Sequence, residues 1–70
     1  MRYAIVIEHA PAIFAAYAPD LPGCVATGAT REEIERLIRE AIEFHLEGLR
    51  ADGQPFPPPS SQVEYVDISV

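Results

Sequence analysis

The sequence predicts an α+β fold in which one long helix packs on one face of a small, mostly antiparallel sheet. Two observations support this class: short apolar runs in the first 27 residues, and one long stretch with apolar residues at spacings of three and four. A third is a last apolar run after a proline-rich segment. The predicted order is strand, strand, strand, helix, strand, within a single domain over residues 1–70.

Three short strands are predicted before the helix. Residues 2–8 alternate between two faces and form the first. The chain then breaks over His9–Ala12 and resumes at residues 13–18, a spacing typical of an antiparallel hairpin. Pro22-Gly23 fits the central pair of a type II turn, because glycine accepts the positive φ that this turn requires. Residues 24–27 leave room for a third strand.

The helix is the clearest predicted element. Thr30 is a suitable N-cap, and Glu33 three residues later completes a capping box. Gly53 is a natural stop. The apolar residues between them form one stripe on one face, which must be buried against the sheet. They are Ile34, Leu37, Ile38, Ala41, Ile42, His45, Leu46 and Leu49.

The region after the helix divides into a connector and a last predicted strand. Residues 53–61 include Pro55 and three consecutive prolines, which favour an extended connector over a peptide-recognition ligand. Residues 63–70 are apolar enough to form a strand, which returns from the helix by a crossover and can run parallel to its neighbour. At least one sheet edge stays open, and open edges pair with other chains.

Composition limits the functions available to the chain. Five basic against eleven acidic residues give a net charge of −6, which lacks the basic footprint of nucleic-acid binding. An acidic chain attracts basic protein partners, although the charge by itself favours solubility alone. A core this small gains from self-association, so we expect a homo-oligomer, either dimer or tetramer. The apolar run at residues 1–7 is too short for a signal peptide or a membrane span, so we expect a cytoplasmic protein.

The candidates for chemistry are few, and we expect no catalytic residue, metal or cofactor. Cys24 is the single cysteine, which excludes an internal disulfide and is typical of a small buried side chain. His45 lies in the apolar stripe, where a hydrogen-bonded core histidine is favoured over a proton shuttle or a partner contact. A two-metal nuclease would need converging carboxylates. The candidates are Glu8, Asp20 and Asp67, with Glu33 or Glu40 from the helix. Turns explain Glu8 and Asp20 as well, the capping box explains Glu33, and Glu40 lies on the solvated face.

Two segments together resemble the HicB-like antitoxin family. They are Pro-Asp-Leu-Pro-Gly-Cys at 19–24 and Gly-Ala-Thr-Arg-Glu-Glu at 28–33, followed by the amphipathic helix and the prolines. The resemblance implies a partial ribonuclease-H-like fold with the same strand and helix order. It also implies a non-enzymatic protein that binds a small, basic, RNA-cleaving toxin of the HicA type and blocks its active site.

The sequence departs from the family pattern at two points. Ala29 stands where the family often has an acidic residue. The sequence ends at Val70, whereas many members continue into a DNA-binding segment, so we expect a short form that lacks this extension and does not repress its own operon. An orphan regulatory or structural homo-oligomer without a toxin partner is the alternative function, and a metal-dependent nuclease is the weakest.

The partner-binding residues are expected in the acidic turn that precedes the third strand, because a protruding acidic turn beside an open edge can meet a basic surface. These residues are Asp20, Leu21, Pro22, Gly23 and Cys24.

Overall fold

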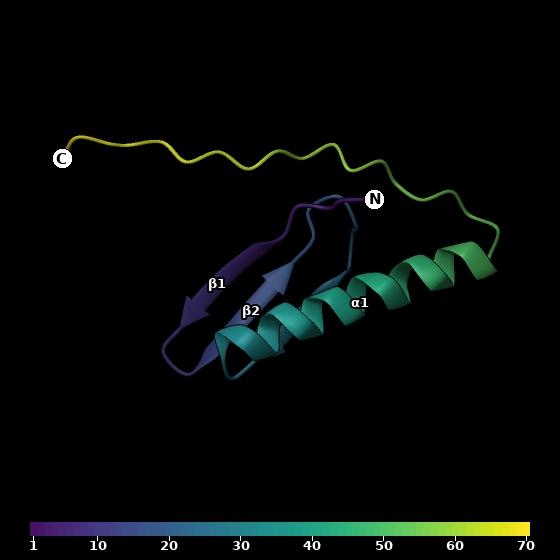
Figure 1. Ribbon diagram of the computed structural model, residues 1–70, viewed down its shortest axis with the longest axis horizontal. Helices are drawn as coiled ribbons and strands as arrows, with labels where there is room; N and C mark the ends of the chain where they lie inside the picture. Colours follow the sequence, from purple (N-terminus) through teal and green to yellow (C-terminus); the bar gives the residue numbers. More distant parts are fainter.

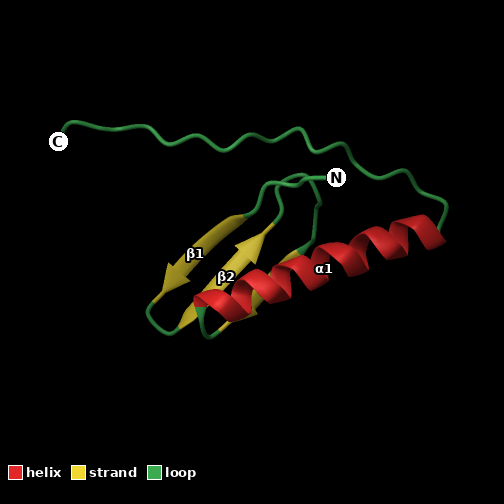
Figure 2. Cartoon of the chain, in the orientation of Figure 1, coloured by secondary structure: helices red, strands yellow, loops and turns green.

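The computed structural model describes residues 1–70 and contains three strands followed by one helix. The elements are β1 (Val6–Ala10), β2 (Ile13–Tyr17), β3 (Val25–Gly28) and α1 (Arg31–Ala51). The sheet has the order β1-β2-β3 with both pairs antiparallel. The helix lies across one face of this sheet (Figure 1, Figure 2). The predicted α+β class is confirmed.

The first strand lies later in the sequence than predicted. It spans Val6–Ala10 rather than residues 2–8, and the predicted break over His9–Ala12 shortens to Pro11-Ala12. The reason is pairing across the hairpin: the His9 ring stacks on Phe14 of β2 with centroids 4.0 Å apart and planes within 3°. Local turn chemistry predicted a break beginning at His9, but the cross-strand contact keeps His9 and Ala10 in the strand.

The turn between β2 and β3 has the predicted conformation. Gly23 has φ of 81°, and the Cys24 amide donates to the Leu21 carbonyl at 3.0 Å, as in a type II turn with Pro22 at its first central position. The Ala18 amide donates to the Cys24 carbonyl at 3.2 Å, which closes the base of the loop. The side chains of Leu21 and Cys24 are consequently held beneath the helix as part of the core.

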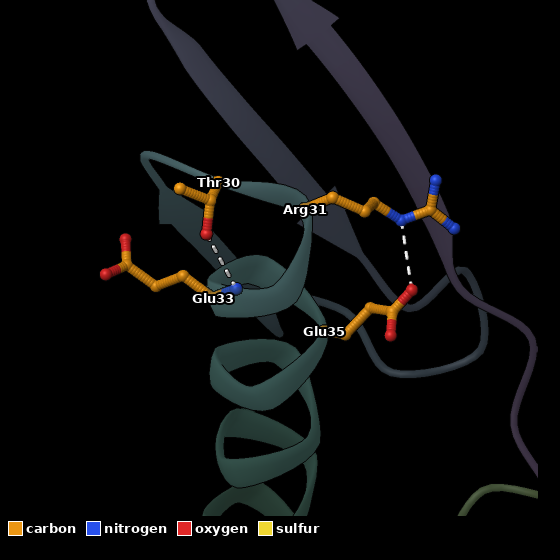
Figure 3. A network of polar contacts seen from close by, with 4 residues as sticks. All are labelled: Thr30, Arg31, Glu33 and Glu35. Atoms are coloured by element: carbon orange, nitrogen blue, oxygen red, sulfur yellow. Dashed lines mark hydrogen bonds and ion pairs between the residues drawn. The ribbon is translucent and has the colours of Figure 1, made fainter.

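The helix begins at the predicted cap (Figure 3). Thr30 Oγ1 accepts from the Glu33 amide at 3.1 Å. The Glu33 carboxylate reaches back to accept from the Ala29 amide at 2.7 Å, one residue earlier than in the usual capping box. An exposed Arg31–Glu35 ion pair at 3.0 Å lies on the same turn. The bonds to Thr30 Oγ1 and to the Glu33 carboxylate satisfy amides at the start of the helix that have no partner within it.

The C-terminus of the helix also ends as predicted. Gly53 has φ of 68°, and its amide donates to the Arg50 carbonyl at 3.1 Å. The Gln54 amide donates to the Leu49 carbonyl at 2.9 Å. This pair of bonds is the Schellman motif, in which glycine takes the left-handed conformation without steric cost.

The core lies where the first half of α1 meets β2, β3 and the loop between them. Its buried members are Ala16, Ala18, Leu21, Cys24, Ile34 and Ile38. A helix of 21 residues rises about 31 Å, whereas a strand of four residues spans about 13 Å, so the second half of α1 extends past the sheet (Figure 1). Ala41, Ile42 and Leu46 therefore pack only partly against the core.

The predicted last strand, residues 63–70, is wrong for the isolated chain. Residues 54–70 form neither helix nor strand, and residues 58–70 are all exposed. The segment follows an extended path past the N-terminus and beyond the sheet (Figure 1). The Cα radius of gyration is 13.8 Å, against about 11 Å for a compact chain of this length. A strand requires a neighbouring backbone as well as a suitable sequence, and this segment has none.

Substitution of two glycines tests the packing of the helix. A Cβ at Gly28 would lie 3.0 Å from Glu33 Oε1 and 3.3 Å from the Ile34 amide nitrogen, so we expect Gly28→Ala to destabilise the fold by about 1–3 kcal/mol. Gly48 is the matched control, because a Cβ there meets nothing within 4 Å and alanine favours the helix by about 0.5–1 kcal/mol. Denaturant unfolding at one fixed protein concentration measures the change in the free energy of unfolding for both variants. Equal effects of the two substitutions would contradict this packing.

Candidate functional site

The predicted partner-binding turn divides into buried and exposed residues. Leu21 and Cys24 are 1% and 3% exposed and belong to the core. Pro22 and Gly23 are exposed at the tip of the turn, and Asp20 is half-buried at its base. The turn can therefore offer a partner the surfaces of Asp20, Pro22 and Gly23, while Leu21 and Cys24 hold the turn in place.

The Asp20 carboxylate already has partners within the chain. Its Oδ2 accepts from the Ser61 amide at 2.9 Å, and its Oδ1 accepts from the hydroxyls of Ser61 at 2.7 Å and Ser60 at 3.2 Å. Because the Ser61 amide bond and then the Ser61 hydroxyl bond favour the ionised form, the pKa of Asp20 lies below its usual value. The acidic residue of the turn therefore anchors the C-terminal segment.

A second contact holds the same segment four residues earlier. The Tyr3 hydroxyl donates to the Pro57 carbonyl at 2.6 Å in a partly buried position. Tyr3 precedes β1 and Asp20 follows β2, and the pairing of Val6 with Tyr17 places both at the same end of the sheet. The C-terminal segment thus crosses this end of the sheet and is fixed there over residues 57–61.

A cleft of about 710 Å³ lies between β1 and the flank of α1. Its apolar walls include Ile5 and Ile7 from the β1 side and Ile42 and Leu46 from the helix. Arg39 and Glu43 are among its polar lining residues. This cleft was not predicted from the sequence. The available signal was the length of the apolar stripe, which exceeds what a sheet of short strands can cover.

Cys24 and His45 line a second, shallower cleft of about 440 Å³ at the other flank of the helix. Burial raises the pKa of the Cys24 thiol, which keeps it protonated, as expected of a small core side chain. His45 is half-buried and takes part in none of the side-chain hydrogen bonds. The expectation of a hydrogen-bonded core histidine is therefore wrong, because the overhanging part of the helix leaves this position at an edge.

The carboxylates considered for a nuclease do not converge. Glu8 lies on the hairpin, Asp20 is bound to the two serines, and Asp67 lies in the exposed C-terminal segment. No three His, Cys, Asp or Glu side chains lie close enough together to hold a metal ion. No helix in the structure combines the length and the apolar character that a membrane crossing requires.

Residues 3–69 match the family of HicB-like antitoxins of bacterial toxin–antitoxin systems. The chain belongs to this family. A "UPF0150 protein" of Helicobacter pylori is 45% identical over 51 residues, covering 73% of this chain and 71% of its own length. An uncharacterised 14.9 kDa protein of Haemophilus phage HP1 is 34% identical over 67 residues, covering 96% of this chain. This HicB-like chain spans half the length of the phage protein.

A solved structure shares both the fold and the sequence pattern. It is a chain of the "HicA3 and HicB3 toxin-antitoxin complex", with a TM-score of 0.72 and 37% sequence identity. The match covers 84% of this HicB-like chain and 70% of the solved chain. The family identification from the two segments, 19–24 and 28–33, is therefore confirmed.

The anchoring of the C-terminal segment by Asp20 depends on pH. The lowered pKa of Asp20 means that the anchor is fully present above the usual pKa of an aspartate and is lost as the pH falls through the lowered value. We expect the Ser61 amide resonance to titrate with an acidic midpoint below that of a free aspartate, and Asp20→Asn to remove this transition. A Ser61 amide that does not respond to acid would show that the anchor is absent in solution.

Proposed function

We propose that this chain binds and neutralises a small, basic, RNA-cleaving toxin of the HicA type. The observation that carries the proposal is the likeness to a chain of a toxin–antitoxin complex at 37% identity over 84% of the present chain. Membership of the antitoxin family supports the same role. The mechanism would be inhibition by contact, in which the antitoxin covers the toxin's active site and performs no chemistry itself.

The charge of the chain suits this role. Eleven acidic against five basic residues attract a basic protein and repel nucleic acid, so we propose that the chain acts on the toxin rather than on RNA or DNA directly. We place the protein in the cytoplasm, where such a toxin would meet its RNA. We also propose that the chain works as a homo-oligomer, since its isolated core contains only six buried apolar side chains.

The contact surface we propose is the turn around Asp20 together with an open strand edge. Pro22 and Gly23 protrude at the tip of this turn, and Asp20 places a negative charge at its base. Leu21 and Cys24 would support the surface from beneath through their packing in the core. A rigid turn with one fixed carboxylate loses little conformational freedom on binding, which favours affinity.

Co-expression with a small basic protein encoded beside it tests the proposed function. We expect a complex that survives purification and suppresses cleavage of RNA by that partner. The partner alone, expressed under tight control, provides the reference activity. A partner that cleaves RNA equally well in the presence of the chain would contradict the antitoxin role and favour an orphan regulatory or structural module.

Charge reversal at the turn tests the contact surface. We expect Asp20→Lys to weaken toxin binding by about tenfold or more, because it places like charges against each other. Two control variants separate the possible causes of a loss of toxin affinity. Asp52→Lys makes the same change of charge at the exposed end of α1. Ser60→Ala with Ser61→Ala removes the hydroxyl contacts to Asp20 and leaves the turn's charge intact.

Calorimetric titration of purified toxin into each variant gives the comparison. Loss of affinity confined to Asp20→Lys supports the turn as the contact. Equal losses in Asp20→Lys and the serine variant would assign the effect to the C-terminal segment, and unchanged binding in Asp20→Lys would place the interface elsewhere.

A further inference from the structure

The C-terminal segment exposes an unusual amount of apolar surface. Half of the ten exposed large hydrophobic side chains of the protein lie in it: Val63, Tyr65, Val66, Ile68 and Val70. In an extended chain alternate residues share a face, so Val66, Ile68 and Val70 form one apolar row. Val66 and Ile68 are 73% and 71% exposed. A row of this kind is typical of a strand that packs against a surface, and here that surface is missing.

The sheet has a matching unpaired edge. β1 pairs with β2 on one side only, because the strand order is β1-β2-β3. Ala10 and Ile13 close the two-residue hairpin turn, so Ala10, Glu8 and Val6 direct their backbone groups to β2. By the same alternation Ile7 and His9 direct theirs away from β2. This edge can therefore accept one more strand.

The cleft beside β1 fits the apolar row. α1 packs mainly over β3 and β2, which leaves the cleft of about 710 Å³ between β1 and the helix flank. Ile5 and Ile7 line one wall, and Ile42 and Leu46 line the other. A strand added beyond β1 would direct every second side chain over this cleft. The row from Val66 to Val70 has the spacing and the polarity to fill it.

The path of the segment leaves it unpaired with β1 of its own protomer. Tyr3 holds the Pro57 carbonyl, and Asp20 holds Ser60 and Ser61, so residues 57–61 stay with their own protomer. Three consecutive prolines at 57–59 resist bending, because each fixes its φ. Residues 62–70 then continue along an extended path without pairing to β1, and of these residues only Tyr65 lines the cleft of its own protomer (Figure 1).

We propose that residues 62–70 of one protomer form a strand along the free edge of β1 in a second copy of this chain, which returns its own segment in the same way. The exchange is reciprocal, so the dimer is twofold symmetric and closes without further copies. It covers the cleft beside β1 in each protomer, removes the free β1 edge and buries the apolar row. The proposal does not depend on toxin binding and is tested without a toxin.

Two substitutions on opposite faces of the segment test the exchange. Ile68→Asp places a carboxylate in the apolar row, whereas Ser69→Asp adds the same charge one residue later on the opposite face. Both positions are exposed in the isolated chain, so neither substitution disturbs the fold of the protomer. Sedimentation equilibrium of the full chain over a range of concentrations measures the dimer dissociation constant. We expect Ile68→Asp to raise it by about 100-fold or more, since a buried unpaired charge is costly, and Ser69→Asp to change it little.

Isotope-filtered NOE measurements on a mixture of labelled and unlabelled chains identify which copy supplies the strand. Intermolecular NOEs from the Ile68 methyl groups to those of Ile5 or Ile7 would establish the exchange. A protein that is monomeric at every concentration would overturn it, as would a dimer in which these NOEs are intramolecular. A dimer that Ile68→Asp leaves intact would also overturn it.

Discussion

The packing of two helical isoleucines onto small side chains of the sheet is the contact on which the rest of the structure depends. Ile34 and Ile38 are 0% and 1% exposed, and they share the core with Ala16 of β2 and with Ala18, which directly follows that strand. Burying each isoleucine contributes about 1.5–3 kcal/mol relative to leaving it in water. Small residues on the strand side allow the helix to approach closely, so few side chains form the whole core.

The N-terminal end of the helix fixes where this packing occurs. Thr30 and Glu33 hold the first turn directly after β3, and the buried Gly28 lets the Glu33 carboxylate and the Ile34 amide come near the strand. A connection this short places α1 over β3 and β2. The flank of α1 toward β1 is left open as a consequence, and the cleft, the free β1 edge and the unpaired C-terminal segment all lie on that side.

The same arrangement suits a protein that works through its surfaces. Its polar side chains mainly cap the helix, pair charges along the exposed face of the helix or anchor the C-terminal segment. An antitoxin role requires a rigid shape with complementary charge, which a capped helix on a short sheet supplies. In the turn at residues 19–24 neighbouring residues serve different purposes, because Leu21 belongs to the core while Asp20 beside it holds the C-terminal segment at Ser60 and Ser61.

The elements whose causes are local could be predicted from the sequence. The cap at Thr30, the Schellman end at Gly53 and the type II turn at Gly23 each follow from a few neighbouring residues, and the two segments at 19–24 and 28–33 identified the family. Tertiary structure decided what depends on a distant partner. Pairing with Phe14 kept His9 in β1, and the mismatch between a long helix and short strands opened the cleft and left His45 at an edge. The strand pattern at residues 63–70 could be read from the sequence, but a strand forms only where another backbone is available to bond it.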